Sequence, residues 1–263
     1  MTPKDRTLDI RDGAVRFRVL SAGRGPHLVS FHSFHERGGW SPFLDRLAAR
    51  YTVHAPFHPG VQGSSGVETL DDVLDLVLAY DELLDRLGIG AAHLVGHFFG
   101  GMVAAELAAT LRPRAAKLVL ISPLGLWRDD APSQDLLILP HEDLPAVLFR
   151  DPASEVARGW ATLPAGEEQN IAAQIESIQR RAAMAKFVWP IPDKGLKKRI
   201  HRIQAPTLII WGRQDGIAPP VYADEFAGRI RNSRVELVEN AGHVPHMEQL
   251  ETVSKLVADF LGV

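Results

Sequence analysis

The sequence contains no cysteine, and this absence excludes several kinds of chemistry at once. A chain of 263 residues without cysteine can form neither a disulfide framework nor a thiolate zinc site, and it has no cysteine nucleophile. No apolar run approaches the roughly 18 residues of a membrane span, and the first 13 residues lack the apolar stretch of a secretory signal peptide. We therefore expect a cytoplasmic protein without a membrane partner.

An excess of positive charge is also missing. The 29 lysines and arginines are outnumbered by 32 acidic residues, which gives a formal net charge of −3. Binding to nucleic acid requires clustered basic side chains that neutralise phosphates, so we expect no nucleic-acid partner. The one basic run, residues 194–202, carries leucine and isoleucine at helical spacing, and a solvated helix face explains it better than a docking patch.

Short aliphatic and β-branched runs alternate with longer segments of helical periodicity, the pattern of a parallel sheet covered by helices on both faces. A hairpin around Asp12-Gly13, formed by residues 8–10 and 15–20, comes first. Six further strands are predicted at residues 27–31, 51–55, 92–95, 117–121, 207–211 and 235–238. With 46% hydrophobic residues and no shift in composition, the chain predicts one α/β domain with an eight-stranded, mostly parallel sheet.

Local signals mark the helices between these strands. Ser41 followed by Pro42 is typical of an N-cap with proline at the first helical position. Thr69 with Asp72 resembles a capping box, and it opens an apolar helical stripe that Gly88 ends. Two further helices are predicted at residues 102–111 and 253–261.

The alternation of strands and helices stops in residues 127–202, where prolines recur and no strand-like run appears. An insertion between two parallel strands emerges at the strand carboxyl ends, where open α/β sheets bind their ligands. We therefore predict a helical cap at residues 127–202 over a core of residues 1–126 and 203–263. Among its aromatic residues, Trp127, Trp160 and Trp189 are candidates to line a pocket.

Residues 93–102, HLVGHFFGGM, lead from a predicted strand through a glycine-flanked turn into an alanine-rich helix. This context resembles the nucleophile elbow of the α/β-hydrolase family, in which glycines such as Gly96 and Gly100 permit a turn too tight for a Cβ atom. The resemblance covers essentially the whole chain and implies an α/β-hydrolase fold. The family pattern G-x-S-x-G has its serine nucleophile at the centre, whereas this sequence has Phe98, whose ring can neither attack a carbonyl nor accept a proton.

Two further motifs match the positions at which the family presents its acid and its histidine. Asp215 follows a predicted buried strand, and His243 follows the last predicted strand. The resemblance implies that Asp215 orients the imidazole of His243, which then serves as the base. Asp129 and Asp130 are weaker candidates for the acid because they lie just inside the predicted cap.

The resemblance also implies an oxyanion hole, formed by backbone N–H groups. One donor is that of Phe99, which follows the elbow residue, and the other comes from the loop after the third strand, where Phe34 is the candidate. Ser33 stands in this loop where the family usually has glycine. His32 in the same loop and His97 in the elbow are further candidates for the pocket wall.

Eleven histidines raise the question of a metal site. No HExxH motif is present, and His54 with His58 spans a strand end rather than one helical face. The spacing therefore presents no ready-made pair of ligands, and we expect neither a metal nor another cofactor.

The resemblance leaves several functions open. The family implies hydrolysis of an ester, a lactone or a carbon–carbon bond in a small apolar substrate, and without a serine water must attack directly with general-base help from His243. A cofactor-free dioxygenase would use the same dyad to abstract a proton from its substrate. In a ligand-binding protein without catalysis, Phe98 would fill the catalytic space, and the chain could also be a hydrolase variant whose serine has been replaced.

Overall fold

An antiparallel hairpin opens the chain, as its sequence predicts. The computed structural model describes residues 1–36, 39–190 and 193–262, and in it β1 (Lys4–Ile10) pairs with β2 (Val15–Ala22). The second strand then pairs antiparallel with β4 (Thr52–Pro56), which joins the hairpin to the rest of the sheet.

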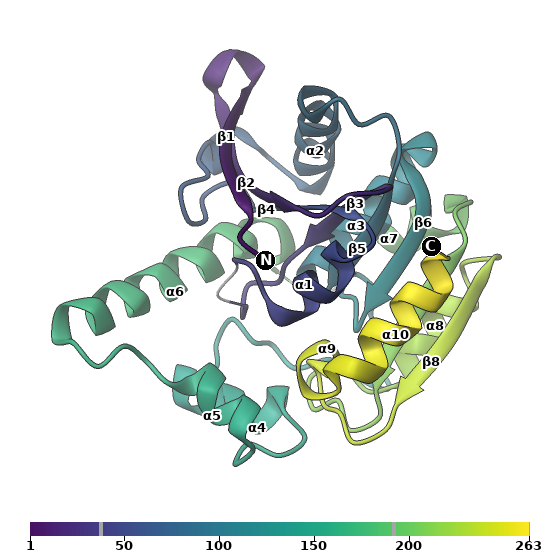
Figure 1. Cartoon of the computed structure of the whole chain (residues 1–263). Coiled ribbons are helices and arrows are strands. Elements are labelled where there is room, and N and C mark those ends of the chain that lie inside the picture. The colour runs from purple at the N-terminus through teal and green to yellow at the C-terminus, as the bar shows by residue number, and fades with distance from the viewer. Residues whose placement is uncertain (37–38, 191–192, 263) are drawn as a thin grey trace.

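All remaining strand pairings are parallel, because helices connect these strands across the faces of the sheet (Figure 1). The strands are β3 (His27–Phe31), β5 (Ala92–His97), β6 (Ala115–Ile121), β7 (Thr207–Gly212) and β8 (Ser233–Val238). Their order across the sheet is β1-β2-β4-β3-β5-β6-β7-β8. The prediction of an eight-stranded, mostly parallel sheet is confirmed.

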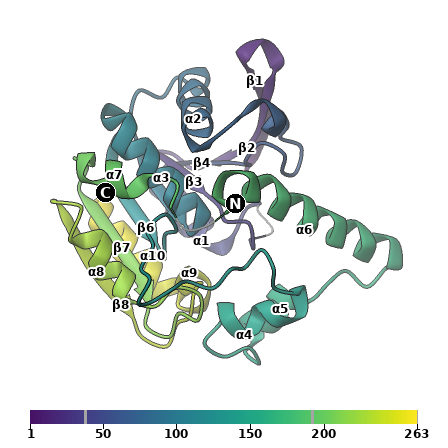
Figure 2. The same cartoon turned by 180° about the vertical axis from the view of Figure 1, so that it is seen from behind.

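Helices cover both faces of this sheet, and two separate hydrophobic clusters fill the two interfaces (Figure 2). One face is covered by α1 (Pro42–Ala48) and α10 (Leu250–Leu261). The other face is covered by α2 (Val73–Leu87), α3 (Phe99–Thr110) and α8 (Val221–Ala227). The loops at the strand carboxyl ends are thereby held between two packed layers.

The helix boundaries agree with most of the local signals. The Ser41 hydroxyl accepts a hydrogen bond from the Leu44 N–H, and Gly88 ends α2 with a φ of 73°. The predicted capping box is wrong, because the side chain of Asp72 itself caps α2 by accepting from the N–H groups of Leu74 and Asp75. Val67–Thr69 instead form a separate 3₁₀ turn.

The segment between β6 and β7 contains helices and, within its described residues, no strand. The α-helices among these described residues are α4 (Leu144–Leu148), α5 (Glu155–Ala161), α6 (Glu167–Val188) and α7 (Leu196–Arg199). Figure 1 shows α4, α5 and much of α6 outside the layers of the core, beside the chain that leaves the sheet. That residues 127–202 act as one cap remains a prediction.

Across the described ranges, none of the helices combines the length and the apolar character needed to cross a bilayer.

Candidate active site

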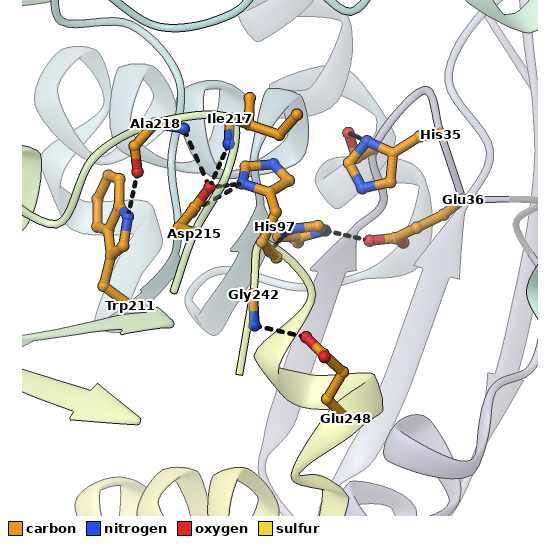
Figure 3. A network of polar contacts seen from close by, with 11 residues as sticks. His35, Glu36, His97, Trp211, Asp215, Ile217, Ala218, Gly242 and Glu248 are labelled. Carbon is orange, nitrogen blue, oxygen red and sulfur yellow. Dashed lines mark hydrogen bonds and ion pairs between the residues drawn. The ribbon is translucent and has the colours of Figure 1, made fainter. Parts of the chain in front are cut away.

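Asp215 and His243 meet at the carboxyl ends of β7 and β8. The Nδ1 atom of His243 lies 2.8 Å from one carboxylate oxygen of Asp215 and 3.0 Å from the other. The carboxylate also accepts hydrogen bonds from the backbone N–H groups of Ile217 (2.8 Å) and Ala218 (3.0 Å), as Figure 3 shows. An acceptor of this kind holds the proton of the imidazole on Nδ1 and leaves a lone pair on Nε2.

The loop that carries His243 is fixed by the segment after β6. The His243 N–H donates to the carbonyl of Leu148, at the end of α4, over 2.8 Å. The carboxylate of Glu248, in α9 (Pro245–Glu248), accepts from the N–H of Gly242 (2.6 Å) and from that of Arg150 (2.8 Å). Burial raises the pKa of Glu248. These contacts tie the histidine loop to the helical insertion.

The turn between β5 and α3 keeps the geometry of a nucleophile elbow although its serine is absent. Phe98 has φ 46° and ψ −106°, a conformation that costs roughly 1–3 kcal/mol in a residue with a side chain. A Cβ atom at Gly96 would lie 2.3 Å from the Gly100 carbonyl oxygen, and one at Gly100 would lie 2.1 Å from that of Phe31. Only glycine fits at either position.

The ring of Phe98 packs against the imidazole of His243. It is 2% exposed, and its centroid lies 4.5 Å from that of His243 with the rings nearly perpendicular. Nε2 of His243 is buried and has no hydrogen-bond partner among the described residues. Phe34 packs against Phe98 (5.4 Å) and Phe99 (6.4 Å), so the two loops expected to form the oxyanion hole are neighbours. The role of their N–H groups remains a prediction.

A cavity of about 520 Å³ opens beside the elbow, at the carboxyl ends of β3, β4 and β5 and below α5. His32, His97 and Trp160 line it, and their role in binding a substrate remains a prediction. Trp127 and Trp189 do not belong to its wall. The indole of Trp127 donates to Asp129 instead, and Trp189 is 54% exposed because it follows the end of α6.

The dyad and Phe98 also lie outside the lining of this cavity. His32 is held neutral in its wall, since burial lowers its pKa to about 4. Its Nδ1–H donates to the carbonyl of Ser33 (3.1 Å), while its Nε2 accepts from the N–H of His58 (3.3 Å). Both ring nitrogens are therefore engaged in supporting the loop, and His32 is a wall residue rather than a free base.

Comparison with known proteins decides the family. A family model described as alpha/beta hydrolase fold matches residues 25–250. The chain belongs to the α/β-hydrolase family.

Relatives with similar sequences are named as dienoate and dienedioate hydrolases. The chain is 28% identical to 2-hydroxy-6-oxo-6-phenylhexa-2,4-dienoate hydrolase of Comamonas testosteroni, over 96% of this chain and 93% of the relative. It is 30% identical to 2-hydroxy-6-oxononadienedioate/2-hydroxy-6-oxononatrienedioate hydrolase of Burkholderia vietnamiensis, over 92% and 86% of the two chains.

Solved structures of the α/β-hydrolase family share the fold. The 2-hydroxy-6-oxo-6-phenylhexa-2,4-dienoate hydrolase of Rhodococcus superposes with a TM-score of 0.74 at 21% identity, covering 99% of each chain. A bacterial membrane phospholipase A superposes with a TM-score of 0.79 at 22% identity, covering 98% of this chain and 86% of the other. At these identities the likeness concerns the fold alone.

In this α/β-hydrolase, further residues lie close to the dyad, and the sequence does not predict that they lie together. His35 lies close to the dyad, with its ring centroid 5.4 Å from that of His243 and 4.9 Å from that of His97. A carboxylate oxygen of Glu36 is hydrogen-bonded to Nδ1 of His97, as drawn in Figure 3, and lies 3.5 Å from Nε2 of His246.

Two sets of three side chains bring potential metal-ligand atoms within 4.8 Å of one another. They are His35, His97 and His243, and Glu36, His97 and His246. Spacing along the chain could not reveal either set, because the members come from three segments that are far apart in the sequence. The one local signal for Glu36 was a carboxylate in a loop otherwise rich in histidine and phenylalanine.

Proposed function

We propose that this α/β-hydrolase uses the dyad of His243 and Asp215 as a general base on a small, mostly apolar carbonyl compound. The observation that carries the proposal is the hydrogen bond of 2.8 Å between Nδ1 of His243 and Asp215, together with an Nε2 atom that no described residue engages. An imidazole oriented in this way can take a proton through Nε2 while the carboxylate stabilises the resulting charge.

The reaction that fits these groups is hydrolysis by direct attack of water. Nε2 of His243 accepts a proton from water as the hydroxide adds to the substrate carbonyl, and the tetrahedral intermediate then expels its leaving group, which takes the proton back. No covalent intermediate forms on Phe98, since its ring has no nucleophilic atom. An ester, a lactone or an activated carbon–carbon bond can be cleaved in this way, and the names of the dienoate hydrolases support the last of these.

Access to the base requires a movement of Phe98. Its ring packs against His243, and Nε2 is buried in the present arrangement. A rotation of the ring toward the neighbouring cavity of about 520 Å³ would open a path between that cavity and the dyad. The substrate is accordingly expected to enter from the cavity and to displace the ring.

The experiment compares the wild type with His243→Ala and with His201→Ala, a matched histidine variant at an exposed position. A 2-hydroxy-6-oxo-hexa-2,4-dienoate substrate and p-nitrophenyl butyrate are supplied with and without oxygen. Turnover that is lost in His243→Ala, retained in His201→Ala and independent of oxygen supports hydrolysis. Consumption of oxygen would instead identify the dyad as the base of a cofactor-free dioxygenase.

A second function, ligand binding without catalysis, is favoured by the ring of Phe98 itself, which is 2% exposed and covers the base. It predicts no turnover of any substrate in the wild type, even when a dienoate binds measurably. Phe98→Ala separates the two functions, because removal of the ring exposes His243. If the ring blocks catalysis in the wild type, only Phe98→Ala turns over the substrate. If the wild type is an enzyme, it turns over the substrate with the ring in place.

A further inference from the structure

Glu36, His97 and His246 converge from three parts of the chain onto one point beside the dyad. Glu36 lies in the loop after β3, His97 ends β5, and His246 belongs to α9. A carboxylate oxygen of Glu36 is hydrogen-bonded to Nδ1 of His97 and lies 3.5 Å from Nε2 of His246, and the two imidazole centroids are 4.6 Å apart.

The proton on Nε2 of His97 determines what must lie between Nδ1 of the same ring and Glu36. Nε2 of His97 lies 2.9 Å from the carbonyl oxygen of His243, which can only accept, so Nε2 carries a proton. A neutral ring then presents a lone pair at Nδ1, directed at the carboxylate of Glu36. Two lone pairs cannot face each other at hydrogen-bond distance, so either a proton, carried by His97 or by Glu36, or, once the two side chains move apart, a metal cation must lie between them.

The state of Glu36 strengthens this argument. Its carboxyl group lies between the imidazoles of His97 and His246, and its side chain is only 20% exposed. A buried carboxylate of this kind needs positive charge beside it.

We propose that Glu36, His97 and His246 form a binding site for a divalent first-row transition metal ion such as Zn²⁺, with its open coordination positions facing the cavity. Two imidazoles and one carboxylate are the ligand set of many zinc hydrolases and of facial iron sites, and both keep positions open for water or substrate. All three side chains line the cavity of about 520 Å³. The bond from His97 to the His243 carbonyl is the outer-shell contact that orients a ligating imidazole.

The competing set, His35, His97 and His243, shares one ligand with the proposed site. It has no carboxylate ligand to balance the charge of the ion, and ligation through Nε2 would occupy the atom by which His243 is proposed to act as a base. The carboxylate and the open face toward the cavity favour the set that contains Glu36. The proposal replaces the expectation from spacing that the chain has no metal site, and it does not depend on the activity of the dyad.

The test is a titration of chelator-treated protein with Zn²⁺ by calorimetry, and with Co²⁺ by its visible absorption, in the wild type and single variants. One ion per chain is expected for the wild type, and Glu36→Gln and His246→Asn should each lower the affinity by at least about 10-fold, the lower end of the cost of losing an outer-shell partner. His201→Asn is the matched control, since this exposed residue belongs to neither set.

Folding is checked independently of metal binding. Each variant is melted without metal, and the melting temperature of the wild type, but not that of Glu36→Gln, should rise with added Zn²⁺ because an ion that binds only the folded state stabilises it. Three results overturn the proposal. They are no binding by the wild type, equal binding by the wild type and Glu36→Gln, or binding that is lost in His35→Asn and retained in Glu36→Gln. If the wild type binds no ion, a proton and not a metal lies between His97 and Glu36.

Discussion

The ring of Phe98 stands edge-on to the imidazole of His243, with the two centroids 4.5 Å apart and the ring planes 85° apart. The residue at the centre of the elbow thus contacts the histidine that a nucleophile would need as its base. It does so from a backbone conformation with φ 46° and ψ −106°, which is unfavourable for phenylalanine. The turn therefore has the backbone shape of an elbow and lies beside His243, with phenylalanine at its centre.

Phe98→Ser is expected to create or sharply raise esterase activity. The serine hydroxyl would occupy the elbow beside Nε2 of His243, Asp215 would orient the imidazole, and the N–H of Phe99 would be available to a developing oxyanion. Ser33 in the oxyanion loop limits the gain, because one poorly placed donor can cost roughly 10²–10³ in rate. Turnover of p-nitrophenyl acetate and butyrate measures the effect.

The control for this prediction is the double variant Phe98→Ser/His243→Ala. It keeps the new hydroxyl and removes only the base, so its rate should fall back toward that of the wild type. If the single and the double variant hydrolysed both esters equally fast, His243 would not be a base in position for catalysis, and the assignment of the dyad would be wrong.

Gly100→Ala should strongly destabilise the fold. The added Cβ atom would lie 2.1 Å from the backbone oxygen of Phe31 and 2.7 Å from that of His32, and neither can move without breaking the contact between α3 and β3. We expect a loss of about 3 kcal/mol or more in the free energy of unfolding, measured with urea. Gly159→Ala is the control, since nothing lies within 4 Å of its Cβ position in α5 and alanine favours a helix. A loss of similar size in both variants would contradict the prediction.

The sequence predicted the sheet because it depends on local patterns, and the proximity of Asp215 and His243 follows from the same patterns. Buried strands read as apolar runs, and Asp215 and His243 each follow such a strand, so parallel topology alone brings them to one edge. The pocket was predicted less well. Trp189 is exposed and Trp127 bonds to Asp129, because the packing of short helices in an insertion has no sequence period that tells a pocket wall from a surface. Glu36 and His246 lie about 210 positions apart in the sequence and meet only in the folded chain, which no spacing rule describes.

The ion pair of Glu106 with Arg199 fixes α7 against α3. Glu106 is 2% exposed and accepts two hydrogen bonds of 2.7 Å from the guanidinium. Arg199→Met should cost about 3–5 kcal/mol of unfolding free energy because it leaves a buried carboxylate unpaired. The double variant Arg199→Met/Glu106→Met should recover much of this loss, since it removes the uncompensated charge.

A matched surface pair is the comparison for this prediction. Arg46 and Glu251 form an ion pair in which both side chains are more than half exposed, so Arg46→Met should leave the stability almost unchanged. Denaturant unfolding of the three variants decides the matter. If Arg199→Met were as stable as Arg46→Met, the pair of Arg199 and Glu106 would not anchor α7.

The last prediction concerns stability as a function of pH, and it rests on His54. This side chain is 4% exposed in β4, and burial, together with the positive charges of His27 and Arg6, lowers its pKa from 6.5 to about 4. Its ring nitrogens are hydrogen-bonded to the hydroxyl of Ser21 (3.0 Å) and to the ring of His27 (3.1 Å). Between pH 6.5 and 4 the unfolded chain therefore binds more protons at His54 than the folded chain does, and stability falls as the pH falls. The contribution of His54 to the free energy of unfolding is fully present above pH 6.5, and a drop from pH 7 to pH 5 should remove about 2 kcal/mol of it.

The variant His54→Asn tests this prediction, because its side-chain oxygen can still accept from Ser21 but does not titrate. It should lose less stability between pH 7 and pH 5 than the wild type, while the exposed control His201→Asn should follow the wild type. Urea unfolding at pH 7, 6 and 5 measures all three, and parallel pH profiles for His54→Asn and the wild type would show that His54 is not kept neutral by the fold.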